Sequence, residues 1–170
     1  MSSLYEVSIP VYTDIVKTTQ SILKKGEDHI KDGAELVKLK IADDMLPLDK
    51  QVFIIVATGR KLIERVTGGE PVDTPMKDYS LPECHELLEA LLAELSKVDR
   101  SQVDPRATTE VPCKFGPEEF KASARDYVFG YPIPTGYFHL NMIYALLRGK
   151  GVPLGKKDYM GEFMKTFTKA

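Results

Sequence analysis

The sequence has no tryptophan, only two cysteines and three histidines, and no long hydrophobic run. The two cysteines, Cys84 and Cys113, do not form a CxxC pair, so no local zinc or redox motif is present and a reducing compartment is favoured. The longest apolar run, Val52–Ala57, is far shorter than the roughly 20 residues that a membrane-spanning helix needs. The first residues contain neither a charged n-region nor an apolar h-region, so we predict no signal peptide. We therefore expect a cytoplasmic protein that does not contact a membrane.

An excess of positive charge is also missing. Lysine and arginine number 23 against 25 aspartate and glutamate residues, and they are scattered along the chain. Because a nucleic-acid-binding surface needs clustered positive charge, we expect no nucleic-acid partner. The 43% apolar and 28% charged residues are typical of a globular protein. The length of 170 residues predicts a single domain over 1–170 with a substantial core.

Four segments carry apolar residues at helical spacing. Proline at Pro10 predicts a kink or a late start in the first of them. The second begins with acidic residues and Pro47, a combination typical of a helix N-terminus. The third begins with Ser80 and Glu83, which form a capping-box pattern. The predicted helices cover residues 4–32, about 44–67, 80–99 and 135–148. Helices of this kind bury their apolar stripes against one another, so the sequence predicts an all-α four-helix bundle.

The segment between the third and fourth helices loses the helical period. Loose alternation over 108–114, a possible turn at 115–117 and residues 119–121 predict a small β-hairpin or an ordered loop. Residues 123–130 are expected to form a short helix. The C-terminal tail, 152–170, is expected to pack on the bundle.

Four polar side chains occupy positions in phase with the apolar stripes: His29, Asp44, Gln51 and His139. Burying such groups costs free energy unless they are paired or used. In an up-down-up-down bundle, the end of the first helix lies beside the starts of the second and fourth, so all four residues can meet at one end. A partly buried imidazole near a carboxylate can act as a general acid or base at neutral pH. We therefore predict a catalytic site in which His139 transfers protons, supported by the other three.

Each of these residues also has a structural interpretation. Asp44 can serve as a helix N-cap, and Gln51 can hydrogen-bond a neighbouring loop. His29 can lie at the rim, stabilised by the helix C-terminus. Two histidines and a carboxylate are also zinc or iron ligands, but no HxxxH or HExxH spacing is present. We therefore predict no metal and no cofactor.

Tyrosines form a second group close to His139. The residues are Tyr127, Tyr131, Tyr137 and Tyr144. Core packing is the simplest interpretation. The alternative is an aromatic wall that binds a flat or cyclic small molecule as substrate.

Several motifs resemble one known family. They are residues 44–48 (DMLPL), 51–52 (QV), 126–127 (DY), 137–139 (YFH), 144–148 (YALLR) and, most specifically, 151–161 (GVPLGKKDYMG). The chain resembles the domain of unknown function numbered nineteen-ninety-three, a family of small bacterial and fungal proteins among the DinB-like helical bundles. The resemblance implies a DinB-like four-helix bundle and a homodimer.

DinB-like relatives include metal-dependent enzymes that use one histidine on the second helix and an HxxxH pair on the fourth. Here Gln51 lies roughly where the second-helix histidine would be, and His139 is the one member of the pair that is present. We therefore favour a metal-independent small-molecule enzyme that catalyses isomerisation, dehydration or cyclisation. A non-catalytic ligand-binding or dimeric interaction protein, and a metalloenzyme with a degenerate site formed by His29, Asp44 and His139, remain as alternatives.

Overall fold

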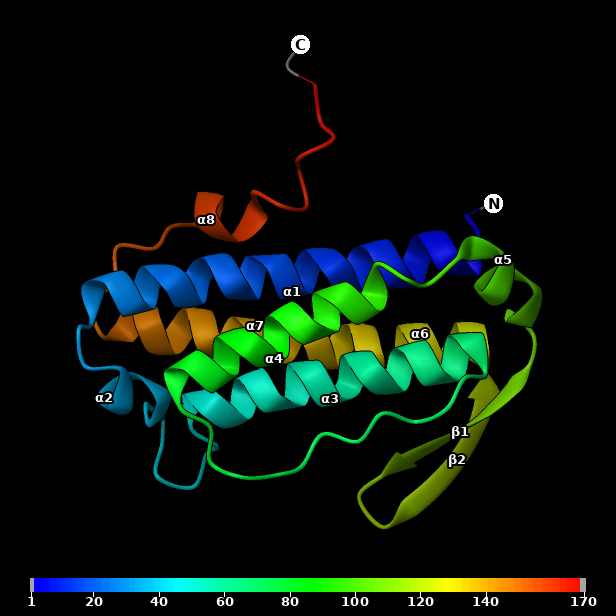
Figure 1. Ribbon diagram of the computed structural model, residues 1–170, viewed down its shortest axis with the longest axis horizontal. Coiled ribbons are helices and arrows are strands. Elements are labelled where there is room, and N and C mark those ends of the chain that lie inside the picture. Colours follow the sequence, from blue (N-terminus) through cyan, green and yellow to red (C-terminus); the bar gives the residue numbers. More distant parts are fainter. Residues whose placement is uncertain (1, 169–170) are drawn as a thin grey trace.

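Four long helices form the body of the protein (Figure 1). The computed structural model describes residues 2–168. The long helices are α1 (Leu4–His29), α3 (Leu48–Thr67), α4 (Leu81–Leu95) and α7 (Pro132–Gly149). Between and after them lie α2 (Gly33–Val37), α5 (Arg100–Val103), the 3-10 helix η1 (Asp104–Arg106), strands β1 (Glu110–Phe115) and β2 (Glu118–Ser123), α6 (Ala124–Gly130) and α8 (Lys156–Met160). The chain is thus mainly helical, but it has more helices than the four long ones and the short one over 123–130 that the sequence predicted, because other connections also contain short helices.

Helix α1 begins at Leu4, where Ser3 and Glu6 form a capping box. Pro10 lies inside this helix. Of the two expectations for this proline, a kink or a late start of the helix, the late start is therefore wrong. Proline is best tolerated in the first turn of a helix, because its missing N–H is unpaired there in any case. At Pro10 the helix loses one internal hydrogen bond and continues because its apolar face is buried.

The path of the long helices differs from the up-down-up-down order assumed above. Helix α3 ends at Gly68, whose φ of 73° gives a left-handed cap. Residues 68–80 then run back along the bundle, so α4 starts at the same end as α3 (Figure 1). Arg60 of α3 binds Glu94 of α4, and Lys50 binds Asp78 just before α4, as expected for parallel neighbours. Helices α1 and α7 are also parallel, since Gly26 lies against Leu147 and Gly136 lies against Ile15.

Tyr12 lies at the centre of the bundle and is fully buried. Its hydroxyl donates a hydrogen bond to the backbone oxygen of Ile55 at 2.8 Å. Gly59 and Gly136 lie against its ring, and a Cβ at these positions would approach ring carbons to 2.7 Å and 3.1 Å, respectively. Two glycines therefore make the space that allows α1, α3 and α7 to pack around one aromatic ring.

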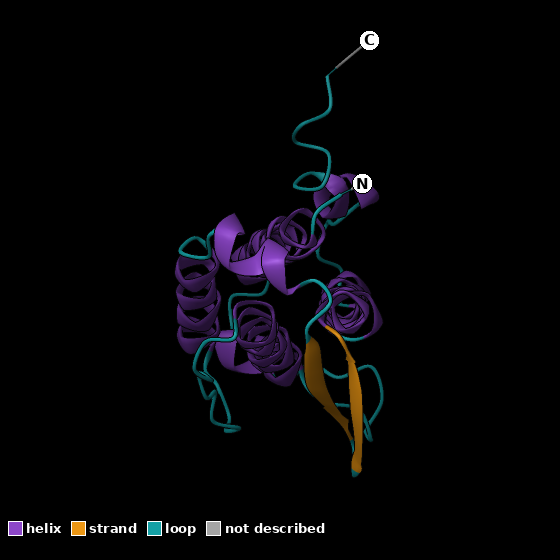
Figure 2. Ribbon diagram, turned by 90° about the vertical axis from the view of Figure 1, so that its right-hand side faces the viewer, coloured by secondary structure: helices purple, strands orange, loops and turns teal. Residues whose placement is uncertain are grey.

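The predicted hairpin is present as an antiparallel pair that pairs Val111 with Ala122 and Cys113 with Phe120. It projects from one end of the bundle (Figures 1 and 2). The short helix expected over 123–130 is α6, and it starts at a cap formed by Ser123.

The C-terminal segment lies along α1, with α8 over the bundle (Figure 1). Lys25 of α1 pairs with Asp158, and Asp14 pairs with Lys165. The segment thus contacts α1 through these two pairs, whereas the last described residues lead away from the bundle (Figure 1). Met1 and residues 169–170 of the expected domain lie outside the described residues. Among the described residues, no helix combines the length and the apolar character needed to cross a membrane.

Candidate functional site

Gln51 and His139 meet between the antiparallel helices α3 and α7. Gln51 is buried, with 3% of its surface exposed, and its Oε1 lies 2.6 Å from Nδ1 of His139. Its Nε2 donates a hydrogen bond to the backbone oxygen of Leu46 at 2.8 Å. Because the amide nitrogen is used by Leu46, the atom that faces the imidazole is the oxygen, which only accepts hydrogen bonds.

This pairing determines the protonation pattern of the neutral imidazole. Nδ1 of His139 must donate its proton to Gln51, so Nε2 carries a free lone pair. Within residues 2–168, no group forms a hydrogen bond with Nε2, and this atom is not among the fully buried polar atoms that lack partners. Nε2 is therefore open to a ligand or to solvent.

Burial lowers the pKa of His139 to about 4. The ring of Phe138 contacts the imidazole edge-on, with ring centroids 5.1 Å apart. At neutral pH the imidazole is therefore uncharged, and Nε2 is a hydrogen-bond and proton acceptor.

Asp44 does not join this pair. It lies in an exposed turn over 41–45, in which the N–H of Met45 bonds the oxygen of Ala42. The cap of α3 is Pro47, which has no capping side-chain bond. A residue that precedes proline avoids helical geometry, so Leu46 keeps the acidic residues outside the helix. The interpretation of Asp44 as an N-cap is therefore wrong, and among the described residues its carboxylate forms no hydrogen bond with Gln51 or His139.

His29 lies beside the C-terminal end of α7, whereas the assumed up-down-up-down path placed it beside the start of that helix. It is exposed, and its Nε2 is the nearest atom to a Cβ placed on Gly151. Because α1 and α7 are parallel, the end of α1 lies beside the end of α7. Ten residues of helix, about 15 Å of rise, separate His139 from that end. The predicted convergence of all four polar residues is thus replaced by the Gln51–His139 pair.

The four tyrosines divide into two groups. Tyr127 and Tyr131 lie together, with ring centroids 5.8 Å apart, beside the hairpin. Tyr137 packs on Phe163, and Tyr144 packs on Tyr159, so this pair holds the C-terminal segment. A single aromatic wall is therefore not formed, because successive helix positions face different neighbours.

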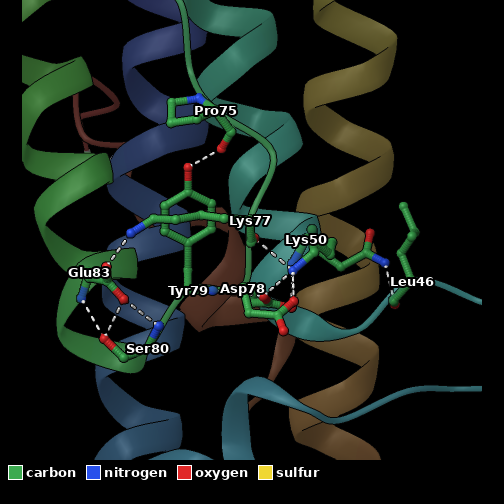
Figure 3. Close-up of polar contacts among 10 residues, drawn as sticks. Leu46, Lys50, Pro75, Lys77, Asp78, Tyr79, Ser80 and Glu83 are labelled. Carbon is green, nitrogen blue, oxygen red and sulfur yellow. Dashed lines mark hydrogen bonds and ion pairs between the residues drawn. The ribbon is translucent and has the colours of Figure 1, made fainter.

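The same end of α3 contains a buried ion pair that sequence reasoning missed. Asp49 is 4% exposed, accepts a hydrogen bond from the N–H of Tyr79 at 3.1 Å and lies 2.6 Å from Nζ of Lys50. Lys50 also donates to the oxygen of Lys77 and to Asp78 (Figure 3). Because all three ammonium protons have acceptors, this arrangement fastens the returning segment 68–80 to α3.

The donor set at His139 does not fit a metal. Among the described residues, no three histidine, cysteine, aspartate or glutamate side chains gather as a metal site. A three-ligand site needs partners that His29 and Asp44 do not provide here. We therefore derive no step through a metal.

Two cavities lie near these groups. One of about 690 Å³ is bounded by the end of α1, by α2 and by the starts of α3 and α4, and Asp49 and Tyr79 are in its lining. Another of about 420 Å³ lies beneath the hairpin, and Tyr127, Tyr131 and Thr135 are in its lining. Thr135 of the second cavity is one helical turn before His139 on α7, and His139 itself is not in the lining of either cavity.

Comparison with known proteins identifies the family. A crystal structure of a DinB family member from Shewanella denitrificans has a TM-score of 0.84 and 24% sequence identity, covering 98% of this chain and 95% of that one. At this identity, the likeness establishes the fold alone. No curated protein matches the sequence. The model of DUF1993, described as a domain of unknown function, matches residues 4–160. The chain therefore belongs to the DUF1993 family and has a DinB-like fold.

Proposed function

We propose that this protein is a metal-independent small-molecule enzyme in which His139 transfers protons. The observation that carries this proposal is the bond of 2.6 Å between His139 and Gln51. It fixes one tautomer and presents Nε2 as an acceptor, which is what a general base requires. Asp44 and His29 have no part in this step.

The proposed reaction moves one proton by way of Nε2 of His139. Nε2 takes a proton from a C–H or O–H group of the substrate, and the electron pair of that bond stays on the substrate. The imidazolium formed is unfavourable because burial disfavours its charge, so Nε2 gives up a proton to another atom of the same molecule. In dehydration that atom is the oxygen of the leaving hydroxyl group, whose C–O bond breaks as water departs. Exchange of the Nε2 proton with solvent before this return introduces deuterium when the solvent is D2O. Isomerisation, dehydration and cyclisation all need such a transfer. Gln51 acts as a positioning residue, because it holds Nδ1–H throughout.

The test is hydrogen exchange in D2O, followed by proton NMR on a panel of cyclic ketones and hydroxylated ring compounds. We expect the protein to replace C–H by C–D in at least one compound, also after treatment with a chelator. His139→Ala should abolish the exchange, while Asn141→Ala, an exposed position on the same helix, should preserve it. Absence of exchange across the panel, or exchange that His139→Ala leaves unchanged, contradicts the proposal.

A second candidate function is binding without turnover, alone or as a homodimer. It is favoured by the exposed apolar side chains of Phe138 and Leu46, which are 54% and 42% exposed and are close in sequence to the Gln51–His139 pair. Large exposed apolar side chains mark interaction surfaces when they are grouped. Light scattering, which measures the molar mass in solution, tests this candidate. It predicts that the parent protein is a dimer and that Phe138→Ala dissociates more readily.

A further inference from the structure

The hairpin has one apolar face and one charged face. Cys113 and Phe115 alternate on β1 with Glu110 and Lys114, and Phe120 is paired with Cys113. Residues that are directly opposite in an antiparallel pair point to the same side, so the phenylalanines and the cysteine share a face. The charged face is the ordinary solvent side of a hairpin, whereas the apolar face requires an explanation.

The bundle covers only the base of that apolar face. Val111 is 3% exposed, but Phe115 is 69% and Phe120 is 49% exposed. The hairpin leaves the bundle as it extends (Figure 2), and the cavity of about 420 Å³ lies between it and the segment 126–135. Its lining consists of Cys113, Phe115, Phe120, Ala122, Asp126, Tyr127, Gly130, Tyr131 and Thr135.

Three hydroxyl groups in this lining have unused hydrogen-bonding capacity. Among the described residues, the side-chain oxygens of Tyr127, Tyr131 and Thr135 form no hydrogen bond, and none is sealed from solvent. Tyr127 itself is 3% exposed, so it is fixed in the core and only a small part of it reaches the cavity. Aromatic walls with a few hydrogen-bonding groups are typical of small-molecule sites.

Charge restricts the ligand further. Asp126 is the one charged residue in the lining, and its carboxylate repels an anion. We propose that the hairpin cavity binds a neutral or cationic aromatic molecule of one or two rings, which stacks on Phe115 and Phe120 and accepts hydrogen bonds from the tyrosine hydroxyls. A concave surface of this volume suits such a molecule better than the surface of a second copy. That the same molecule is the substrate of His139 rests on the proposed function, since Thr135 is one turn, about 6 Å, from His139.

The probe for this test is coumarin, a neutral two-ring lactone, and its binding is measured by calorimetry. Phe120→Ala should raise Kd about tenfold, since it removes a stacking ring, and Tyr131→Phe about fivefold, since it removes one donor. Phe129→Ala is the matched control, because Phe129 is 48% exposed and is not in the lining. Coumarin-3-carboxylate should bind at least tenfold more weakly than coumarin.

Thiol labelling gives an independent measurement. Cys84 is buried and burial raises its pKa to about 12, so a maleimide should react at the half-buried Cys113. At a coumarin concentration close to the parent Kd, coumarin should slow this labelling in the parent protein and in Phe129→Ala, and much less in Phe120→Ala, because the Kd of that variant is about tenfold higher. Absence of coumarin binding, equal affinity for the carboxylate, or unchanged affinity in both cavity variants overturns the proposal. Binding that persists without any His139-dependent exchange overturns the proposed function and leaves the cavity assignment standing.

Discussion

Gln51 of α3 accepts a hydrogen bond of 2.6 Å from His139 of α7 while its amide nitrogen binds Leu46 at 2.8 Å. One buried side chain thus satisfies a loop carbonyl and orients an imidazole on a neighbouring helix. Buried polar groups of this kind are expensive to leave unpaired, so the pair can be tested separately from any substrate.

Replacing Gln51 with leucine should destabilise the protein by about 2 kcal/mol, because it leaves both the Leu46 oxygen and the His139 N–H without partners. The free energy of unfolding from urea denaturation measures this loss. Asn141→Leu is the control for the exchange of an amide side chain for leucine, because Asn141 is exposed and its side chain forms no hydrogen bond among the described residues. Equal stability of Gln51→Leu and the parent protein would show that the bond contributes nothing.

Gln51→Glu should raise the pKa of His139. A carboxylate beside Nδ1 favours the charged imidazolium and opposes the burial that now holds the pKa at about 4. We expect an upward shift of at least one pH unit, measured by NMR titration of the imidazole C–H signals. A titration midpoint that stays at the parent value contradicts the assignment of Gln51 as the partner of Nδ1.

The stability of the protein should depend on His139 in mildly acidic solution. An unfolded histidine has a pKa near 6.5, whereas burial lowers the folded value to about 4. Between these values the unfolded chain binds a proton that the folded chain does not, so stability falls as pH decreases from about 6.5 to about 4. The free energy of unfolding of the parent should therefore increase relative to that of His139→Gln as the pH rises from about 4 to about 6.5. The exposed His29→Gln variant controls for the loss of a histidine.

Asp49→Asn should destabilise the protein by about 3 kcal/mol, because it leaves the ammonium of Lys50, whose side chain is 12% exposed, without its buried partner. Asp78→Asn removes the other carboxylate that binds Lys50, but this group is fully exposed and its loss should have little effect. The free energies of unfolding of both variants, measured by thermal and urea denaturation, test this difference. Similar losses in the two would show that the buried carboxylate has no special role in fastening residues 68–80.

Gly59→Ala should cost about 2 kcal/mol through overpacking, since its Cβ would lie 2.7 Å from both Leu91 and the Tyr12 ring. Gly149→Ala is the matched control: it is also helical, and nothing lies within 4 Å of its Cβ, so it should be neutral or slightly stabilising. Unfolding midpoints of the two variants test the packing around Tyr12. A tolerated Gly59→Ala would mean that the three helices can separate at low cost.

The helices themselves follow from local sequence. The capping box at Ser80 and Glu83, the glycine cap after α3 and apolar residues at helical spacing act within a few residues of each other, so they can be recognised without a structure. Gln51 and His139 were also recognisable, because each interrupts an apolar stripe. The loose alternation over residues 108–114, the turn at 115–117 and residues 119–121 predicted a hairpin or an ordered loop for the same local reason, and the structure has the hairpin.

Tertiary structure decided which of these residues meet. The return of residues 68–80 along the bundle makes α3 and α4 parallel, and likewise α1 and α7, so His29 is carried to the end of α7 and away from His139. Pro47 excludes Asp44 from α3, while Asp49, five residues later and inside the helix, is the buried carboxylate. Sequence periodicity specifies which face of a helix is apolar, but the direction and neighbours of each helix depend on packing between segments that are distant in the chain. That is why the sequence by itself determined the four long helices and the unusual polar residues, and only the packed bundle decided that Gln51 is the partner of His139.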